Sequence, residues 1–98
     1  MWEPIMVPKC ICTKKELEKG HIQGDLLIFP CSKAIEAQDY ESVTYVYNGH
    51  IFHDVKHSLS NNLIKSQRPI EVTHERFNTI VLPAGGYWFI SLHNIIER

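Results

Sequence analysis

The sequence has no long apolar run, few cysteines and almost no excess charge. No stretch approaches the roughly 18 apolar residues that span a bilayer, and the opening segment MWEPIMVPKC lacks the charged start and apolar run of a signal peptide. Three cysteines in 98 residues do not build a disulfide framework. The formal net charge of -1 gives no bulk attraction to nucleic acid or anionic lipid. We therefore expect a cytoplasmic protein with no membrane contact and no bulk nucleic-acid binding.

Motifs for cofactors and catalysis are also missing. No glycine-rich phosphate loop precedes a helix, because Gly85-Gly86 lies between two predicted strands. Cys10-Ile11-Cys12 is a CxC, whereas zinc sites need about four ligands, usually spaced as CxxC, so we interpret the thiols as structural. The candidate nucleophiles have no partner at a spacing typical of a catalytic triad: Ser42, Ser58 and Cys31. The sequence favours a protein without catalytic residues, cofactor or metal.

Short strand-like segments dominate what is present. Hydrophobic residues make up 44% and charged residues 21%, which is ordinary for a globular protein, and the length suits one β-rich domain over 1–98. A capping box at Thr13 and Glu16 predicts one helix over about 14–19. The segment SKAIEAQDYE fits either a helical turn or a loop. The remaining strands are predicted in these stretches: GDLLIFP, the hairpin VTYVY-NG-HIFHDV, NNLIKS, PIEVTHE, NTIVLP and GYWFISL. We expect a small antiparallel β-barrel or sandwich-like domain with one short N-terminal helix.

The Asn48-Gly49 pair is the strongest local signal, because both residues tolerate the positive φ of a two-residue hairpin turn. Such a turn fixes the register, and the expected cross-strand pairs are Tyr47 with His50, Val46 with Ile51, Tyr45 with Phe52, and Thr44 with His53. Alternation then places His50 and His53 on opposite faces, with Val55 on the His53 side. A local metal site made of His50, His53 and His57 is therefore not expected.

Two groups of side chains, one aromatic and one polar, remain as candidate binding surfaces. One face of the hairpin gathers aromatic rings that either stack a flat ligand such as a nucleobase or form part of the core. The turn segment THERFN gathers side chains that either contact a phosphate or carboxylate or form an ordinary charged turn. The candidate ligand-binding residues are Tyr45, Tyr47, His50, Arg68, His74, Arg76 and Asn78.

The order of three motifs resembles a group of small uncharacterised bacterial and phage proteins. These have a G-D-hydrophobic strand, a G-H-x-H segment and an H-E-x-H-x-x-I-x-L-P-x-G-x-Y segment, and the matching stretches are GDLLIFP, NGHIFH and THERFNTIVLPAGGY. The likeness covers about 24–87. Two positions depart from it: the first histidine motif is G-H-x-x-H, and Phe77 replaces the second histidine of H-E-x-H. The resemblance implies a compact accessory protein, phage-encoded in some members, with no established activity.

Three functions are compatible with these observations. The first, which we favour, is a non-catalytic binding protein, such as a phage accessory or counter-defence factor that sequesters a nucleotide-like signal or blocks a host protein; we expect it to be a homo-oligomer. The second is a metal-dependent hydrolase that uses His50, His74 and Glu75, with His93 as a further ligand. The third is a structural or protein-interaction module that docks through Trp2, Trp88 or a sheet edge.

Overall fold

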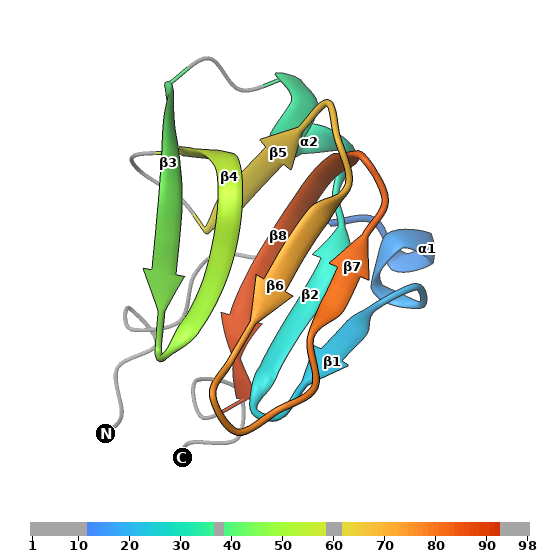
Figure 1. The fold of residues 1–98 in the computed structure, drawn as a ribbon. Coiled ribbons are helices and arrows are strands. Elements are labelled where there is room, and N and C mark those ends of the chain that lie inside the picture. Colours follow the sequence, from blue (N-terminus) through green and yellow to red (C-terminus); the bar gives the residue numbers. More distant parts are fainter. Residues whose placement is uncertain (1–11, 37–38, 59–61, 93–98) are drawn as a thin grey trace, which may run out of the picture.

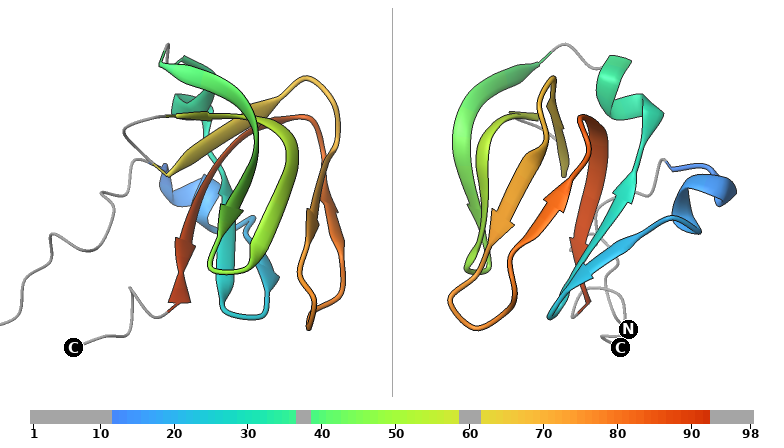
Figure 2. Two further views of the ribbon diagram at one scale, coloured as in Figure 1. Left: turned by 60° about the vertical axis from the view of Figure 1, so that its left-hand side comes forward. Right: turned by 45° about the vertical axis from the view of Figure 1, so that its right-hand side comes forward.

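Eight strands form one antiparallel sheet in the computed structural model, which describes residues 12–36, 39–58 and 62–92 (Figure 1). The strands are β1 (His21–Gln23), β2 (Leu26–Pro30), β3 (Tyr40–Tyr47), β4 (His50–Ser58), β5 (Leu63–Ser66), β6 (Ile70–Thr73), β7 (Ile80–Leu82) and β8 (Gly85–Ser91). Their order is β1-β2-β8-β5-β4-β6-β7, and β3 pairs with β4 outside this path. The sheet curls into a nearly closed barrel (Figure 2). The predicted antiparallel β-barrel is therefore confirmed.

Two short helices lie in the described ranges, one more than expected. The first, α1 (Lys14–Leu17), begins at the predicted capping box, since Thr13 Oγ1 accepts from the Glu16 N–H and Glu16 Oε1 accepts from the Thr13 N–H. It is shorter than the predicted 14–19. The second, α2 (Ser32–Glu36), shows that the segment SKAIE, which fitted either a helical turn or a loop, is helical. Neither helix has the length and apolar character needed to cross a membrane.

The β3–β4 hairpin follows the predicted register near its turn and departs from it further away. Asn48 and Gly49 have φ of 51° and 84°, and the three pairs next to the turn form as expected. The pairing of Thr44 with His53 is wrong, because a bulge lies there and Asp54 has a φ of 55°. One extra residue in β4 reverses the alternation beyond it. The prediction that Val55 shares the face of His53 is therefore also wrong, since Val55 is buried in the core with Phe52.

The barrel interior holds the main cluster of buried side chains, and a smaller cluster lies on the outer face of the sheet, because Trp88 and Ile90 alternate with the interior residue Phe89 along β8. The main cluster includes Phe52, Phe89, Leu26 and Ile70, with Tyr45 and Tyr47 packed against it. The smaller cluster lies between β2, β5, β8 and α2. It consists of Cys31, Ala34, Leu63, Trp88 and Ile90.

The two ends of the barrel carry different groups. The histidine end holds the β1–β2 turn, the β3–β4 turn and the loop 74–79, at the bottom of Figure 1. The cleft end holds α2 and the β5–β6 connection 67–69, at the top of the same view. Most of the candidate residues lie at or near one of these ends.

Candidate functional site

His50 is fully buried at the histidine end and both of its ring nitrogens are engaged. Nδ1 lies 2.7 Å from Gln23 Oε1, and Nε2 lies 2.8 Å from Asp25 Oδ1. The amide nitrogen of Gln23 donates to two backbone carbonyls, Val72 O at 2.8 Å and Asn78 O at 2.9 Å. Gln23, Asp25 and His50 are called the polar clasp below.

The hydrogen bonds of the polar clasp show which groups donate a proton to which partner. Because Gln23 Nε2 faces two carbonyls, its Oε1 is the acceptor for His50 Nδ1–H. Nε2 of the same ring faces a carboxylate oxygen, and an ionised carboxylate can only accept. One proton therefore lies between His50 Nε2 and Asp25 Oδ1, either as an imidazolium–carboxylate pair or as a neutral ring beside a protonated acid.

The polar clasp closes the barrel at the seam between its first and last strands. β1 and β7 stand at opposite ends of the strand order, and no backbone ladder joins them within the described strands. The Gln23 side chain crosses this seam from β1 to the carbonyls of Val72 on β6 and Asn78 in the loop 74–79. The Gln23 side chain thus satisfies two backbone carbonyls and ties β1 to β6 and to the loop 74–79.

Two glycines let the turns of the histidine end approach each other. A Cβ on Gly24, whose φ is 60°, would lie 2.0 Å from the Phe77 ring, and a Cβ on Gly49 would lie 3.1 Å from His74 Nε2. The His74 ring centroid lies 4.5 Å from those of both His50 and Phe77. The three motif segments quoted above, separate in sequence, therefore meet in one place, and both motif glycines have a steric reason to be glycine.

The aromatic face of the hairpin turns toward the core. Tyr45 stacks on the His57 ring, with centroids 3.7 Å apart, and Tyr47 packs edge-on against Phe89 at 4.9 Å. The Tyr47 hydroxyl accepts from the Ser91 N–H. Burial raises the pKa of Tyr45 above its usual value. Of the two interpretations of this face, the structure supports the core rather than a stacking platform.

The loop 74–79 does not assemble the alternative metal site. His50 has both nitrogens in hydrogen bonds, His74 Nδ1 accepts from the Arg76 N–H at 3.0 Å, and Glu75 is exposed. His93 lies outside the described residues. Arg76 and Asn78 are exposed, so the predicted anion-binding turn offers one surface cation and no enclosed space.

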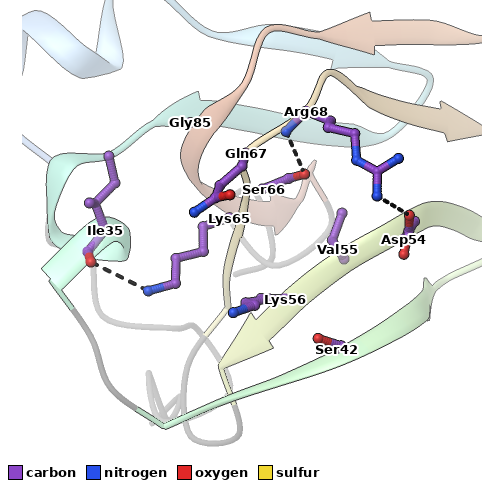
Figure 3. A pocket seen from close by; sticks show the side chains of 10 residues that line it. All are labelled: Ile35, Ser42, Asp54, Val55, Lys56, Lys65, Ser66, Gln67, Arg68 and Gly85. Carbon is purple, nitrogen blue, oxygen red and sulfur yellow. Dashed lines mark hydrogen bonds and ion pairs between the residues drawn. The ribbon is translucent and has the colours of Figure 1, made fainter.

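A cleft of about 490 Å³ opens at the cleft end (Figure 3). Its lining contains three basic side chains and one carboxylate, and it includes Arg68, one of the residues singled out from the sequence. Arg68 faces Asp54 at 3.9 Å, with both side chains 83% exposed. The lining residues are Ile35, Ser42, Asp54, Val55, Lys56, Lys65, Ser66, Gln67, Arg68 and Gly85.

One row of paired residues crosses the cleft. Ser42 on β3 pairs with Lys56 on β4, and Lys56 pairs with Lys65 on β5. Directly opposite residues of antiparallel strands project to the same face, so the two ammonium groups lie on one side of the sheet. Like charges in that position repel each other. The sheet therefore concentrates positive charge on the floor of the cleft.

The aromatic ring of Tyr40 positions one of these lysines. Lys65 Nζ lies 4.3 Å from the Tyr40 ring centroid and donates to the Ile35 carbonyl at 3.4 Å. Burial, with a smaller contribution from Asp39, raises the pKa of Tyr40 to about 12, so its ring stays neutral. A neutral ring attracts the ammonium through its face, which holds the Lys65 ammonium on the side of the cleft floor nearest α2.

Sequence reasoning found Arg68 but missed both lysines of the cleft. Lys56 follows the bulge at Asp54, and an intact hairpin would have placed it on the other face. β4 and β5 are separated in the sequence by residues 59–62, and no turn motif there predicts which residues of the two strands pair. The one available signal was the presence of two basic residues, Lys65 and Arg68, close to the end of the predicted strand NNLIKS.

Comparisons with protein-family models, curated proteins and solved structures gave no match.

Proposed function

We propose that this protein is a non-catalytic binding protein whose cleft holds a small anionic ligand of nucleotide-like chemistry. The observation that carries the proposal is the direct cross-strand pairing of Lys56 with Lys65 on the floor of an open cleft. Like charges opposite each other cost free energy in the empty protein. A bound phosphate or pyrophosphate removes that repulsion and gains two charge-assisted hydrogen bonds.

The size and the other lining groups of the cleft support the same class of ligand. Its volume of about 490 Å³ lies within the range of roughly 300–1,000 Å³ typical of small-molecule sites. Arg68 offers a planar guanidinium for bidentate contact with a phosphate, because its only described ion pair, with Asp54, is long and exposed. Ser42, Ser66 and Gln67 add neutral hydrogen-bonding groups suited to a sugar or base.

The kinds of side chain that line the cleft favour binding over catalysis, since its one carboxylate, Asp54, faces Arg68 rather than a candidate nucleophile. Its described lining contains no histidine or cysteine. His50, the histidine with the most specific partners, is fully buried and saturated at both nitrogens. A proton-transfer group must lie within hydrogen-bonding reach of the substrate, directly or through one water. His50 does not line the cleft, so it cannot act on a ligand bound there.

The biological setting follows from the sequence resemblance. The resemblance to small bacterial and phage proteins with a similar order of motifs supports a role for this protein as an accessory or counter-defence factor that sequesters a nucleotide-like signal. Docking through Trp88, part of the alternative protein-interaction hypothesis, has no support, because Trp88 is only 5% exposed and lies in the smaller core cluster. Trp2 lies outside the described residues.

Isothermal titration with pyrophosphate, ADP and a cyclic dinucleotide tests the proposal. We expect at least one of them to bind the wild-type protein and to lose most of its affinity in Lys65→Ala and in Arg68→Ala. Because contacts to phosphate are charge-assisted, affinity is expected to fall as salt rises. If none binds at saturating concentration, the proposal is wrong.

Lys33→Ala is the matched control for the two cleft variants. Lys33 is also basic and lies on α2, but it faces Glu36 at 3.7 Å and does not line the cleft. Its loss changes the net charge as much as the loss of a cleft residue does. Equal weakening by Lys33→Ala would show that only bulk charge is measured and would contradict a specific cleft site.

A further inference from the structure

We propose that Cys12, Glu16 and Cys31 form a binding site for a thiophilic divalent cation such as Zn²⁺. The two sulfurs and a carboxylate oxygen of these residues all lie within 4.8 Å of one another. Two thiolates bound to one zinc at about 2.3 Å lie roughly 3.7 Å apart in a tetrahedral site. The three side chains therefore need only a small adjustment to share one ion.

The three ligands come from separate parts of the chain and are each held in place. Cys12 directly precedes the helix cap at Thr13 and packs against the smaller core cluster. Cys31 follows β2, is 2% exposed, and donates its N–H to the Gly86 carbonyl at 2.9 Å. Glu16 joins the two, because Oε1 accepts from the Thr13 N–H and Oε2 from the Ser32 N–H, both at 2.8 Å.

The hydrogen bonds of Glu16 prepare its carboxylate rather than block it. Each carboxylate oxygen has a second lone pair after one backbone N–H is satisfied, and hydrogen bonds of this kind typically orient metal ligands. The Ser32 contact draws the carboxylate toward the residue next to Cys31. A helix cap alone would need only the Thr13 contact, so the reach to Ser32 is an additional feature.

The chemistry of the donor set selects the metal. Two thiolates favour zinc over magnesium or calcium, which prefer oxygen-only shells. Three protein ligands leave a fourth tetrahedral position for water. The CxC pattern by itself offers only two ligands, which is why the sequence favoured structural thiols. The fold brings Glu16 and Cys31 close to Cys12 and so provides further ligands.

Cobalt titration of the reduced, metal-stripped protein tests the site. Tetrahedral Co²⁺ bound to thiolates gives a sulfur-to-metal absorption band, and zinc is expected to displace the cobalt. We expect about one equivalent of Co²⁺ per chain in the wild type, and no thiolate band in Cys12→Ser or Cys31→Ser. Absence of the band in the wild type, or an unchanged band in either serine variant, would overturn the proposal.

Two glutamate variants separate metal binding from folding. Glu16→Gln keeps the capping box, because glutamine serves at this position as well as glutamate does, but it removes the anionic ligand. We expect its Zn²⁺ affinity to fall by more than about tenfold, with its circular dichroism spectrum unchanged. Glu18→Gln on the same segment is the control and should bind as the wild type does. Equal affinities in the two variants would contradict Glu16 as a ligand, and a Cys12–Cys31 disulfide that persists in the presence of a thiol reductant would contradict the whole site.

Discussion

The two ends of the barrel handle polar groups in opposite ways. At the histidine end, His50 is 0% exposed and every one of its polar atoms has a partner. At the cleft end, Lys56 and Lys65 face each other across two strands with the same charge. The first arrangement is complete in the protein alone, whereas the second is relieved by an added anion. Polar residues that look equally functional in a sequence therefore close the barrel at one end and, in the function proposed above, bind a ligand at the other.

Removing His50 is expected to give the largest effect. His50→Ala leaves Gln23 Oε1 and the Asp25 carboxylate without their partner at the seam. Losing a fully buried ring and its two side-chain hydrogen bonds costs about 3–5 kcal/mol. Urea denaturation followed by circular dichroism measures the loss. His53→Ala in the same strand is the control, since His53 makes one outward hydrogen bond to Thr73 and should cost less than about 1 kcal/mol.

If both histidine variants lose the same free energy of unfolding, the polar clasp does not close the barrel and the contrast between the two ends fails.

Gly24→Ala is expected to cost about 1–3 kcal/mol, because a β-carbon would meet the Phe77 ring and because φ there is 60°. In the Phe77→Ala background the collision is removed and only the cost of the backbone conformation remains. Thermal unfolding of the two single variants and the double variant measures the coupling. Strictly additive losses would show that the contact between Gly24 and Phe77 carries no strain.

Acid is expected to weaken the fold through His57, which lies near the cleft end of β4. Burial lowers the pKa of His57 below its ordinary value of 6.5, opposed by the weaker influence of Asp39 and Glu41. Between the lowered folded pKa and the ordinary unfolded one, the unfolded chain binds more protons. The contribution of His57 is therefore fully present above about pH 6.5 and is lost as pH falls toward the folded pKa.

Urea midpoints of His57→Phe between neutral and mildly acidic pH test this effect, since phenylalanine preserves the stack on Tyr45. The variant should show a shallower decline in stability than the wild type. An equally steep decline in both proteins would assign the acid sensitivity to other groups.

Lys56→Glu is expected to give the smallest change in stability and a large change in binding. A glutamate opposite Lys65 replaces repulsion by attraction and should stabilise the protein by about 0.2–1 kcal/mol. The same substitution should abolish pyrophosphate binding, because it places a carboxylate on the cleft floor. Differential scanning calorimetry and titration calorimetry on one sample measure both. A destabilised variant that still binds pyrophosphate would reverse the roles assigned to this pair.

Local signals in the sequence predicted much of the fold. The capping box at Thr13, the Asn48-Gly49 turn and the alternation in Ile70–Thr73 each act over a few residues, and each element forms where expected. The bulge at Asp54 was missed, although two successive polar residues, His53 and Asp54, stand between Phe52 and Val55 where strict alternation would have one. That one residue changes which face Val55 and Lys56 occupy.

The candidate sites depended on contacts that no local pattern contains. Sequence reasoning assigned His50 to the Tyr45 and Tyr47 face, which is correct, but its partners Gln23 and Asp25 come from the β1–β2 turn. The cleft arises from the pairing of β4 with β5 and from the position of α2. Strand order and packing between distant segments, rather than propensity, decide both ends of the barrel.

The most direct test of this contrast is an amide chemical-shift titration of the wild-type protein with pyrophosphate. The account predicts saturable shifts at Lys56, Lys65 and Ser66–Arg68, and unchanged signals at His50 and in the loop 74–79. Shifts confined to the histidine end, or no saturable shift at either end, would contradict it.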